Sequence, residues 1–416
     1  MDVIEGGGTG RSRPRRVSLV AAAVVLTAGA AYAAVRSAGA DGPGRAAAPT
    51  VASASAGPSP PPAPSAGLPS GPPITGACGS VAYRPLASLQ RQPVRTGVRL
   101  LVGGYGLRLV DADTGTARPA AGVPASDQET VAEVASTRDR VYVLSTACDG
   151  SAGRIYRVDG AAARPVTGRP AVDLVSGAGR VWAVERPADQ DLALLLRQLG
   201  STRSLVLPAG AYPLADSDAG LVIASRPPDP DNIPSRILVL DPTGARPTRP
   251  LGTGHPLAAG RTDLLLLTGA CAPGDAASCS VTRVEIRTGR VLGRSRLPEG
   301  RVPVSTGSLS GDGKRVAFQL SRPFLATGSG PGHPRSPSDI AVLSLDDGRL
   351  EIVPGLEMAP KTGAGLAFAR TGSWLFMSVS HGDHSHVYAW QPGVPGPLPI
   401  ARLTGPVAWA PPLLTS

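Results

Sequence analysis

Short runs of apolar residues recur along most of this chain at a spacing close to forty residues. The clearest examples are "RVYVL" (140–144), "RVWAV" (180–184) and "GLVIA" (220–224). The same kind of run occurs once before them and three times after them, as "VRLLV" (98–102), "LLLL" (264–267), "RVAFQL" (315–320) and "WLFMSV" (374–379). Runs of this length are typical of β-strands, and unbroken apolar runs are typical of strands that are covered on both sides. The pattern therefore predicts seven copies of a unit built from β-strands.

Each copy contains further segments that read as strands. A second β-rich run follows each apolar run after a loop and often ends in an acidic residue and a glycine turn, as in "ILVLDPTG" (237–244). A third short run follows that turn, and a short apolar piece such as "AVDLV" (171–175) precedes most copies. Four short strands at a period near forty residues are typical of a β-propeller blade. We therefore expect residues 78–416 to form an all-β, seven-bladed β-propeller, because single blades cannot bury both faces of their sheets.

The two ends of the repeat region indicate how such a ring closes. No clear innermost strand precedes the first copy, whereas the chain adds "PVAWAP" (406–411) after the seventh. We expect this C-terminal strand to complete blade one from the inside, which removes two exposed sheet edges.

Two of the blades carry a motif of a known family. The segments "LSGDGKRVAF" (309–318) and "LAFARTGSWLFM" (366–377) resemble the F-S-P-D-G-x-x-I-A-F turn of TolB-like, WD-repeat-like propellers. The first segment lacks the proline, the second keeps only the glycine, and the other five blades show the period without the motif. The resemblance is to membrane-anchored propellers of GC-rich Gram-positive bacteria. It implies a propeller used for protein or ligand contact, and it does not extend to the partners of TolB.

Loop lengths differ between the two predicted faces of the propeller. The turns from first to second and from third to fourth strand are tight, as in "SGDG" and "LDDG". The loops from second to third strand are long in six blades, at 145–154, 185–191, 225–236, 268–280, 321–339 and 380–386. Recognition loops grow and vary, whereas scaffold turns stay short. We call the side with these loops the long-loop face and predict that it is the interaction face.

The predicted loop of the seventh blade, "HGDHSH" (381–386), holds three of the five histidines in the chain. His381, Asp383, His384 and His386 could supply imidazole and carboxylate ligands to a metal ion. Their spacing matches none of the familiar zinc patterns, and four ligands on one short loop rarely converge tetrahedrally. We therefore predict a hairpin loop without a cofactor, and metal binding by these four residues stays open.

The N-terminal region differs in composition from the repeats. Six residues rich in arginine (11–16) run into nineteen uncharged residues (17–35), a length that just spans a bilayer. Arginines on the N-terminal side predict a cytoplasmic tail of residues 1–16 and a propeller outside the cell. The tripeptide Ala31–Ala33 resembles a signal-peptidase site, so a single-pass membrane anchor and a cleaved signal peptide of a secreted protein are both open. Residues 36–77 are rich in Pro, Ala and Ser and predict a disordered tether.

The four cysteines of the chain should pair if the domain is exported. Cys271 and Cys279 share one predicted hairpin loop, so they can meet without a long-range constraint. This leaves Cys78, just before blade one, for Cys148 in the loop of blade two. No CxxC motif of a redox or metal site is present.

Charge and motifs limit the function classes. The formal net charge is +10, but all basic residues except Lys314 and Lys361 are arginines, and they are scattered. Nucleic-acid binders show a basic stripe instead, so no nucleic-acid partner is predicted. The chain has no G-x-S-x-G, H-E-x-x-H or phosphate-binding glycine loop with lysine, and no catalytic residue is predicted.

These patterns favour a non-enzymatic binding or scaffold protein that contacts a protein or a cell-envelope ligand. The alternative is a hydrolase or lyase with an active site at the mouth of the central channel. Residues of several blades would form such a site, and sequence spacing cannot reveal it.

Overall fold

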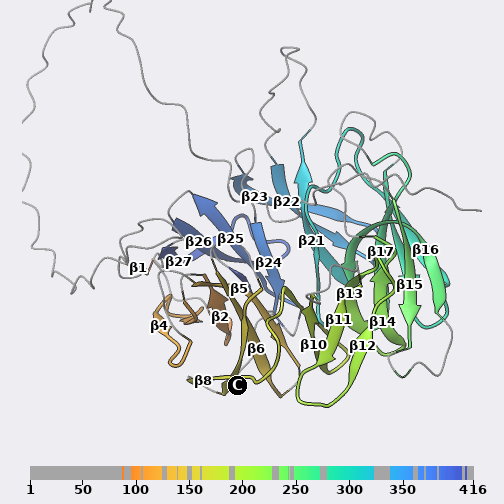
Figure 1. The fold of residues 1–416 in the computed structure, drawn as a ribbon. Helices are drawn as coiled ribbons and strands as arrows, with labels where there is room; N and C mark the ends of the chain where they lie inside the picture. Colours follow the sequence, from red (N-terminus) through yellow and green to blue (C-terminus); the bar gives the residue numbers. More distant parts are fainter. Residues whose placement is uncertain are drawn as a thin grey trace, which may run out of the picture. The chain divides into compact units, whose positions relative to one another are not determined.

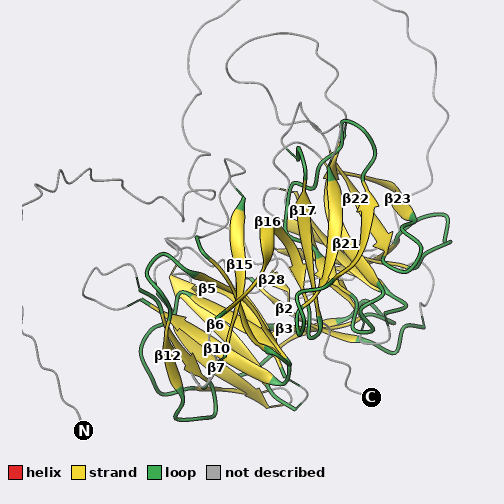
Figure 2. Ribbon diagram, turned by 90° about the vertical axis from the view of Figure 1, so that its right-hand side faces the viewer, coloured by secondary structure: helices red, strands yellow, loops and turns green. Residues whose placement is uncertain are grey.

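The structure is a computed structural model in which the described residues are 87–88 and 95–409. Within that range the positions left out are 105, 124–128, 138, 148–151, 160–161, 187–192, 227–233, 242, 244–247, 272–278, 323–337, 359–363, 370–371, 382–383 and 405–407. The described residues contain strands and turns but no helix (Figures 1 and 2). The all-β prediction is therefore confirmed. All strands belong to the second of two units of the chain, Ala63–Ser416.

The strands form five sheets whose members mostly follow one another in sequence. One sheet has the order β28-β2-β3-β4 and contains β2 (Arg99–Gly103), β3 (Arg108–Asp111), β4 (Ala117–Pro119) and β28 (Ala408–Trp409). The next, in the order β5-β6-β7-β8, contains β5 (Glu129–Ser136), β6 (Val141–Ala147), β7 (Arg154–Asp159) and β8 (Ala162–Pro165).

The largest sheet has eleven strands in the order β12-β11-β10-β9-β13-β14-β15-β16-β17-β18-β19. Its strands are β9 (Asp173–Gly177), β10 (Arg180–Glu185), β11 (Leu195–Gln198), β12 (Ser204–Val206), β13 (Tyr212–Ser217), β14 (Gly220–Ala224), β15 (Ser235–Leu240), β16 (Arg249–Ala259), β17 (Asp263–Thr268), β18 (Ser280–Glu285) and β19 (Val291–Arg296). Two features join groups of strands that the sequence predicted as separate sheets. A single parallel bridge connects β9 with β13, and the long strand β16 pairs with both β15 and β17.

Two further sheets contain the remaining strands. The order β20-β21-β22-β23 comprises β20 (Ser308–Leu309), β21 (Arg315–Ser321), β22 (Ser338–Ser344) and β23 (Leu350–Met358). The order β1-β27-β26-β25-β24 comprises β1 (Ala87–Ser88), β24 (Ala364–Phe368), β25 (Leu375–His381), β26 (His384–Trp390) and β27 (Leu398–Thr404). Within the described residues no sheet closes on itself.

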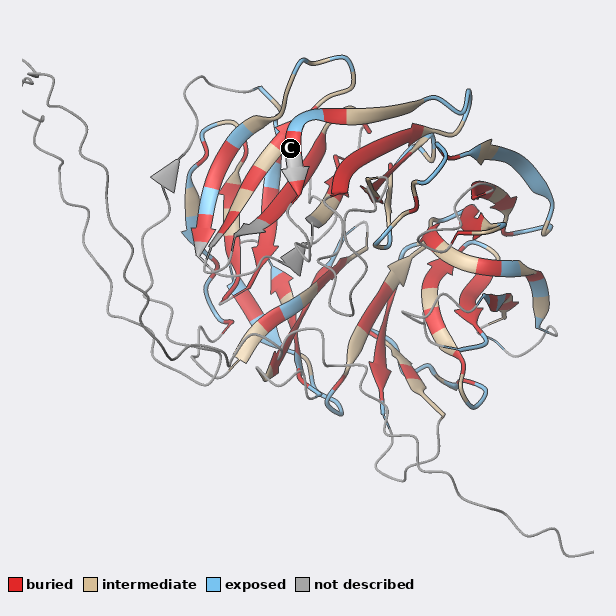
Figure 3. Cartoon of the chain, turned by 90° about the horizontal axis from the view of Figure 1, so that it is seen from above, coloured by how far each residue is buried: buried red, intermediate tan, exposed pale blue. Residues whose placement is uncertain are grey.

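The predicted apolar runs form the most deeply buried strands. Val181–Val184 of β10 and Leu221–Ala224 of β14 are almost fully inaccessible to solvent. Both faces of these strands are covered, because β10 packs against β6 on one face and β14 on the other, and β14 packs against β10 and β17. This explains why the runs are unbroken rather than alternating. Figure 3 shows buried residues along the central strands and exposed residues mostly in turns and outer strands. Each fully buried large side chain contributes roughly 1.5–3 kcal/mol of hydrophobic stabilisation.

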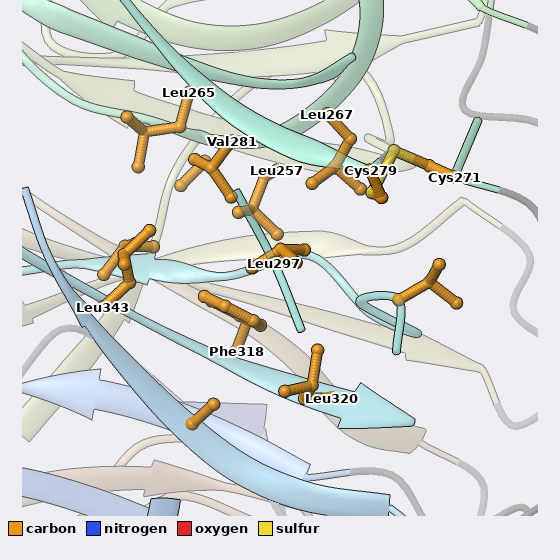
Figure 4. Close-up of a cluster of buried hydrophobic side chains, with 14 residues drawn as sticks. Leu257, Leu265, Leu267, Cys271, Cys279, Val281, Leu297, Phe318, Leu320 and Leu343 are labelled. Carbon is orange, nitrogen blue, oxygen red and sulfur yellow. A yellow bond between two sulfur atoms is a disulfide. The ribbon is translucent and has the colours of Figure 1, made fainter. Parts of the chain in front are cut away.

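Figure 4 shows one of these interfaces between sheets. Leu265 of β17 and Val281 of β18 face Phe318 of β21 and Leu343 of β22 in one continuous cluster. Strands of the largest sheet thereby share a core with the sheet that follows it in sequence.

The C-terminal strand lies where the sequence placed it. In β28, Trp409 is opposite Val102 and Ala408 is opposite Gly103, both antiparallel to β2. Residues more than 300 positions apart therefore pair in one sheet. At the other end of the repeat region, β1 pairs with β27, so a segment preceding β2 borders the last sheet.

The predicted N-terminal tail (1–16), membrane-spanning or signal segment (17–35) and tether (36–77) lie outside the described residues. In the part of the chain that the structure does describe, no helix has the length and apolar character needed to cross a bilayer.

Candidate functional site

Three polar side chains from three consecutive repeats meet where β5, β9 and β13 lie side by side. Tyr212 Oη donates a hydrogen bond to Asp173 Oδ2 at 2.5 Å, and Asp173 also shares a side-chain hydrogen bond with Glu133. The backbone N–H of Leu174 donates to Glu133 Oε2 at 2.6 Å. We call Glu133, Asp173 and Tyr212 the carboxyl–tyrosine cluster.

The three residues occupy the same place in their repeats. Glu133 is opposite Leu144, Asp173 is opposite Val184 and Tyr212 is opposite Ala224. Leu144, Val184 and Ala224 are themselves forty residues apart, each at the end of its apolar run. The repeat therefore places equivalent positions side by side, and in these three repeats the positions carry polar side chains.

Irregular pairing helps to set the direction of two of these strands. The register shifts between Val131 and Glu133 in β5 and between Pro213 and Ala215 in β13. Such bulges increase the local twist and change the direction of nearby side chains, and they are frequent next to functional sites.

The cluster lies toward the long-loop ends of its strands. Asp173 and Tyr212 are the first residues of β9 and β13. Their partners Val184 and Ala224 lie at or next to the ends of β10 and β14, directly before the predicted long loops. Most of the loop residues fall outside the described residues, at 148–151, 187–192, 227–233, 272–278 and 323–337. The cluster thus belongs to the same side of the strands as those loops.

Burial and like charge determine the protonation of the cluster. Burial raises the pKa of Glu133 well above its ordinary value, and the negative charge of Asp173 raises it further. Burial, with Asp173 next in effect, also raises the pKa of Tyr212, so the phenol keeps its proton and acts as a donor. Burial and the neighbouring carboxyl group therefore both favour the protonated form of Glu133. All three residues remain partly accessible to solvent.

This arrangement differs from every fully buried carboxylate in the described structure. Each of those carboxylates contacts at least one arginine: Asp216 with Arg180, Glu185 with Arg197, Asp263 with Arg283, and Asp339 with Arg301 and Arg322. The ion pairs among described residues do not include Glu133 or Asp173. Carboxylates in ion pairs with arginine are typical of structural sites. Two carboxyl groups held next to each other are typical of functional sites.

The geometry allows some reactions and argues against others. A protonated carboxyl next to a carboxylate can donate a proton or accept one from a bound water molecule. Glycosidases instead hold their two carboxyl groups about 5–9.5 Å apart, with the scissile bond between them. Glu133 and Asp173 are in direct contact and leave no room for such a bond.

The structure tests the predicted histidine site only in part. β25 extends to His381 and β26 begins at His384, which is its opposite partner. The prediction of a long loop at 380–386 is therefore wrong, because strand pairing continues as far as His381 and His384. His386 lies within hydrogen-bonding distance of the Tyr388 hydroxyl, with 3.3 Å between its Nδ1 and that oxygen, and Asp383 is outside the described residues. Among described residues no three His, Cys, Asp or Glu side chains are grouped to hold a metal.

The cysteines are described in part. A disulfide joins Cys271 and Cys279, whose Cα atoms are 4.7 Å apart (Figure 4). Cys78 and Cys148 lie outside the described residues, so their pairing stays a prediction.

The carboxyl–tyrosine cluster matches no familiar sequence motif, although the sequence contains a signal for it. Glu133 and Asp173 are forty residues apart, the same offset as the apolar runs. A carboxylate at an equivalent position in two neighbouring repeats would have indicated a contact between them.

Comparisons with known proteins concern the fold. No family model and no curated protein matches the chain. Among solved structures, TolB from Acinetobacter baumannii is 14% identical over 75% of this chain and 67% of its own, with a TM-score of 0.41. A prolyl endopeptidase is 11% identical over 76% of this chain and 50% of its own, with a TM-score of 0.52. An oligogalacturonate lyase in complex with manganese is 13% identical over 78% of this chain and 97% of its own, with a TM-score of 0.44.

At these identities only the fold is shared. The likeness to the endopeptidase, at 11% identity, shows the fold alone. Half of the endopeptidase chain has no counterpart in the alignment. The names include an endopeptidase and a lyase, so the likeness does not separate a binding protein from an enzyme.

Proposed function

We propose that this protein is an extracytoplasmic, seven-bladed β-propeller that binds a protein or a cell-envelope ligand through its long-loop face. Its N-terminal segment, as an anchor or a cleaved signal, would bring the propeller across the membrane. The carboxyl–tyrosine cluster would lie at the mouth of the central channel on that face and supply polar contacts to the ligand.

The order of the strands supports this architecture. The described strands divide into seven successive antiparallel groups of four when β16 is counted once as a fourth and once as a first strand. The first group is completed by β28 from the far end of the chain. A strand from one terminus that completes the sheet of the other is how propellers protect their edges.

The observation that carries the proposal is the lack of an arginine partner for Glu133 and Asp173 within the described residues. Every fully buried carboxylate there has such a partner. A carboxyl pair that shares one proton and remains partly open to solvent keeps hydrogen-bonding capacity for a ligand. The cluster would supply polar groups at the base of the binding site, and the long loops would form its variable sides, as in other recognition sites.

The same cluster also supports a second candidate, a hydrolase or lyase with its active site at the channel mouth. The raised pKa of Glu133 beside Asp173 is the specific observation in its favour. Carboxyl pairs with shared protons serve as general acid and base in enzymes. A glycosidase with these two residues flanking the scissile bond is not compatible with their direct contact.

Affinity capture tests the binding proposal. The full-length protein would be cross-linked to native membranes and its partners quantified by mass spectrometry, for the parent, Asp173→Ala and a variant shortened at 323–337. The matched control is Asp139→Asn, an exposed carboxylate in the tight turn between β5 and β6. Loss of one buried polar contact costs about 1–3 kcal/mol, or roughly 5- to 150-fold in affinity.

We expect the control to capture partners as the parent does and the other two variants to capture less. Equal capture by all four proteins would refute the binding role of this face. Purified partner that is cleaved by the parent but only bound by Glu133→Gln would establish the enzymatic alternative.

A further inference from the structure

One strand from each group of four belongs to a closed series of contacts. We call these strands the inner strands, in the order β28, β5, β9, β13, β16, β20 and β24. Each of them contacts the next, and β24 contacts β28 again. Strands that return to the first in this way surround a common axis, as the inner strands of a propeller do.

One position recurs on all the inner strands. It lies opposite the fifth residue of the runs that begin at Arg99, Arg140, Arg180, Gly220, Asp263, Arg315 and Trp374. For β20 this position lies just before the strand, where Val304 N–H donates to Gln319 O at 2.9 Å. In the order of the inner strands, it holds Ala408, Glu133, Asp173, Tyr212, His255, Val304 and Gly365. We call these seven residues the inner-strand ring.

Polar and apolar residues are separated along the ring. Its four consecutive members from Glu133 to His255 have polar side chains, and the other three are apolar. Val304 is 51% exposed and is one of only four large apolar side chains exposed among the described residues. Three contacts separate β20 from β5 in one direction and from β9 in the other. Val304 therefore lies across the ring from Glu133 and Asp173.

The polar side of the ring has acidic groups but no basic residue to balance them. None of the seven residues is arginine or lysine, and the ion pairs among the described residues do not include Glu133 or Asp173. Both residues remain partly accessible to solvent. Carboxylates attract cations and repel anions, whereas an exposed apolar side chain favours contact with an apolar group. The ring thus presents one side to a positive group and the other to an apolar group.

We propose that the inner-strand ring binds an aliphatic cation, which is an ammonium or guanidinium group on a short apolar stem. The inference rests on the proposed function, whose ligand it specifies. The charged group contacts Glu133 and Asp173 through charge-assisted hydrogen bonds, and the stem contacts Val304. A free amine and a lysine or arginine side chain of a protein partner share this chemistry.

Other classes of ligand fit the ring less well. An anion would meet two acidic residues and no basic residue of the ring. A metal ion requires several suitable ligands, and no three His, Cys, Asp or Glu side chains of the described part of the chain are grouped to hold one. A wholly apolar ligand would cover the acidic side chains without offering them a hydrogen bond, which is unfavourable.

Isothermal titration calorimetry of the full-length protein with n-butylammonium chloride tests the proposal. Butan-1-ol retains the stem without the charge, and ammonium chloride retains the charge without the stem. We expect n-butylammonium to bind, and each of the other two probes to bind about tenfold more weakly or less, because each lacks one of the two contacts. No binding of n-butylammonium, or equal affinities for n-butylammonium and butan-1-ol, would overturn the proposal.

Matched variants assign the two contacts. Asp173→Asn keeps an acceptor for Tyr212 Oη but removes the charge, and it should weaken n-butylammonium binding about tenfold or more. Val304→Ala should weaken it about three- to tenfold through lost apolar contact. The controls Asp139→Asn and Val206→Ala change exposed residues outside the ring and should bind as the parent does. Parental affinity of both ring variants would overturn the proposal, and the comparison of probes on the parent requires no variant to fold.

Two peptides distinguish the sources of the cation. Acetyl-Gly-Gly-Lys-Gly-Gly-amide identifies a protein side chain if it binds more tightly than n-butylammonium, and a free amine if it does not. The same peptide with acetyllysine should bind about tenfold more weakly or less, and equal binding of the two peptides would overturn the proposal.

Affinity capture separates this inference from the proposed function. Loss of partner capture by Asp173→Ala without any binding of n-butylammonium would overturn only the aliphatic cation. Binding of n-butylammonium together with unchanged partner capture by Asp173→Ala and by the variant shortened at 323–337 would support the cation site and overturn only the partner-binding role of the long-loop face.

Discussion

Single residues of this protein show two ways in which a buried carboxylate is accommodated. Asp216 has no solvent exposure and pairs with Arg180, while Trp182 Nε1 also donates to it at 3.3 Å. Glu133 has another carboxyl group as its neighbour instead, and burial and that neighbour's charge raise its pKa. We therefore expect the stability of the protein to respond differently to changes at these two sites.

The stability of the protein should depend on pH through Glu133. Its pKa is higher in the folded than in the unfolded protein, so the folded state binds more protons between these values. The free energy of unfolding should therefore fall as pH rises from about 4.5 through the folded pKa. Each unit of pKa elevation corresponds to about 1.4 kcal/mol.

Glu133→Gln should remove this part of the pH dependence, because an amide can donate to Asp173 without ionising. Urea unfolding at pH 5 and pH 8 measures the effect. We expect the variant to gain stability relative to the parent on going from pH 5 to pH 8. A constant difference between the two proteins would contradict the shared proton.

Removal of Arg180 should be costly, since it leaves Asp216 buried without its countercharge. We expect Arg180→Met to lower the free energy of unfolding by about 3 kcal/mol. The double variant Arg180→Met/Asp216→Asn should recover part of that loss. Arg157→Ala, which breaks an exposed pair with Asp159, serves as the control and should unfold as the parent does. Additive single effects in the double-mutant cycle would disprove the coupling.

At the scale of the elements, packing and strand pairing explain why the apolar runs were predicted correctly as strands and why the loop at 380–386 was predicted too long. The apolar runs form the central strands because packing on both faces requires apolar residues at every position. The hairpin predicted at 380–386 is present, but its loop is shorter than predicted, because polar residues such as Ser385 continue the ladder between β25 and β26. Polarity alone does not end a strand when backbone hydrogen bonds can continue.

The loop between β17 and β18 provides a test at this scale. Non-reducing peptide mapping should recover Cys271 linked to Cys279 and Cys78 linked to Cys148. Closure of the shorter loop contributes about 2–3 kcal/mol by chain entropy, so Cys271→Ser/Cys279→Ser should lower stability by about that amount. Another pairing, or free thiols in the native protein, would show that the loop assignment is wrong.

For the molecule as a whole, the most important contact is the pairing of β28 with β2, which joins the two ends of the repeat region. Deletion of residues 405–416 removes β28 and exposes the edge of β2. The loss should destabilise the cooperative unit by several kcal/mol rather than only fray a terminus, since β2 shares its core with β25 to β27 through Leu100 and Phe376.

Calorimetric melting of the deletion variant and the parent measures this loss. Removal of only residues 411–416, which follow β28, is the matched control and should leave the melting temperature unchanged. A 405–416 deletion that melts like the parent would refute the structural role of the C-terminal strand.

The sequence by itself determined the strand content, the repeat and the C-terminal partner of β2. Each of these depends on local apolar periodicity and on counting strands, which a linear pattern records directly. The tertiary structure decided that Glu133, Asp173 and Tyr212 meet. This contact depends on which residues of different repeats become neighbours, and that is a property of packing that no single segment of the chain contains.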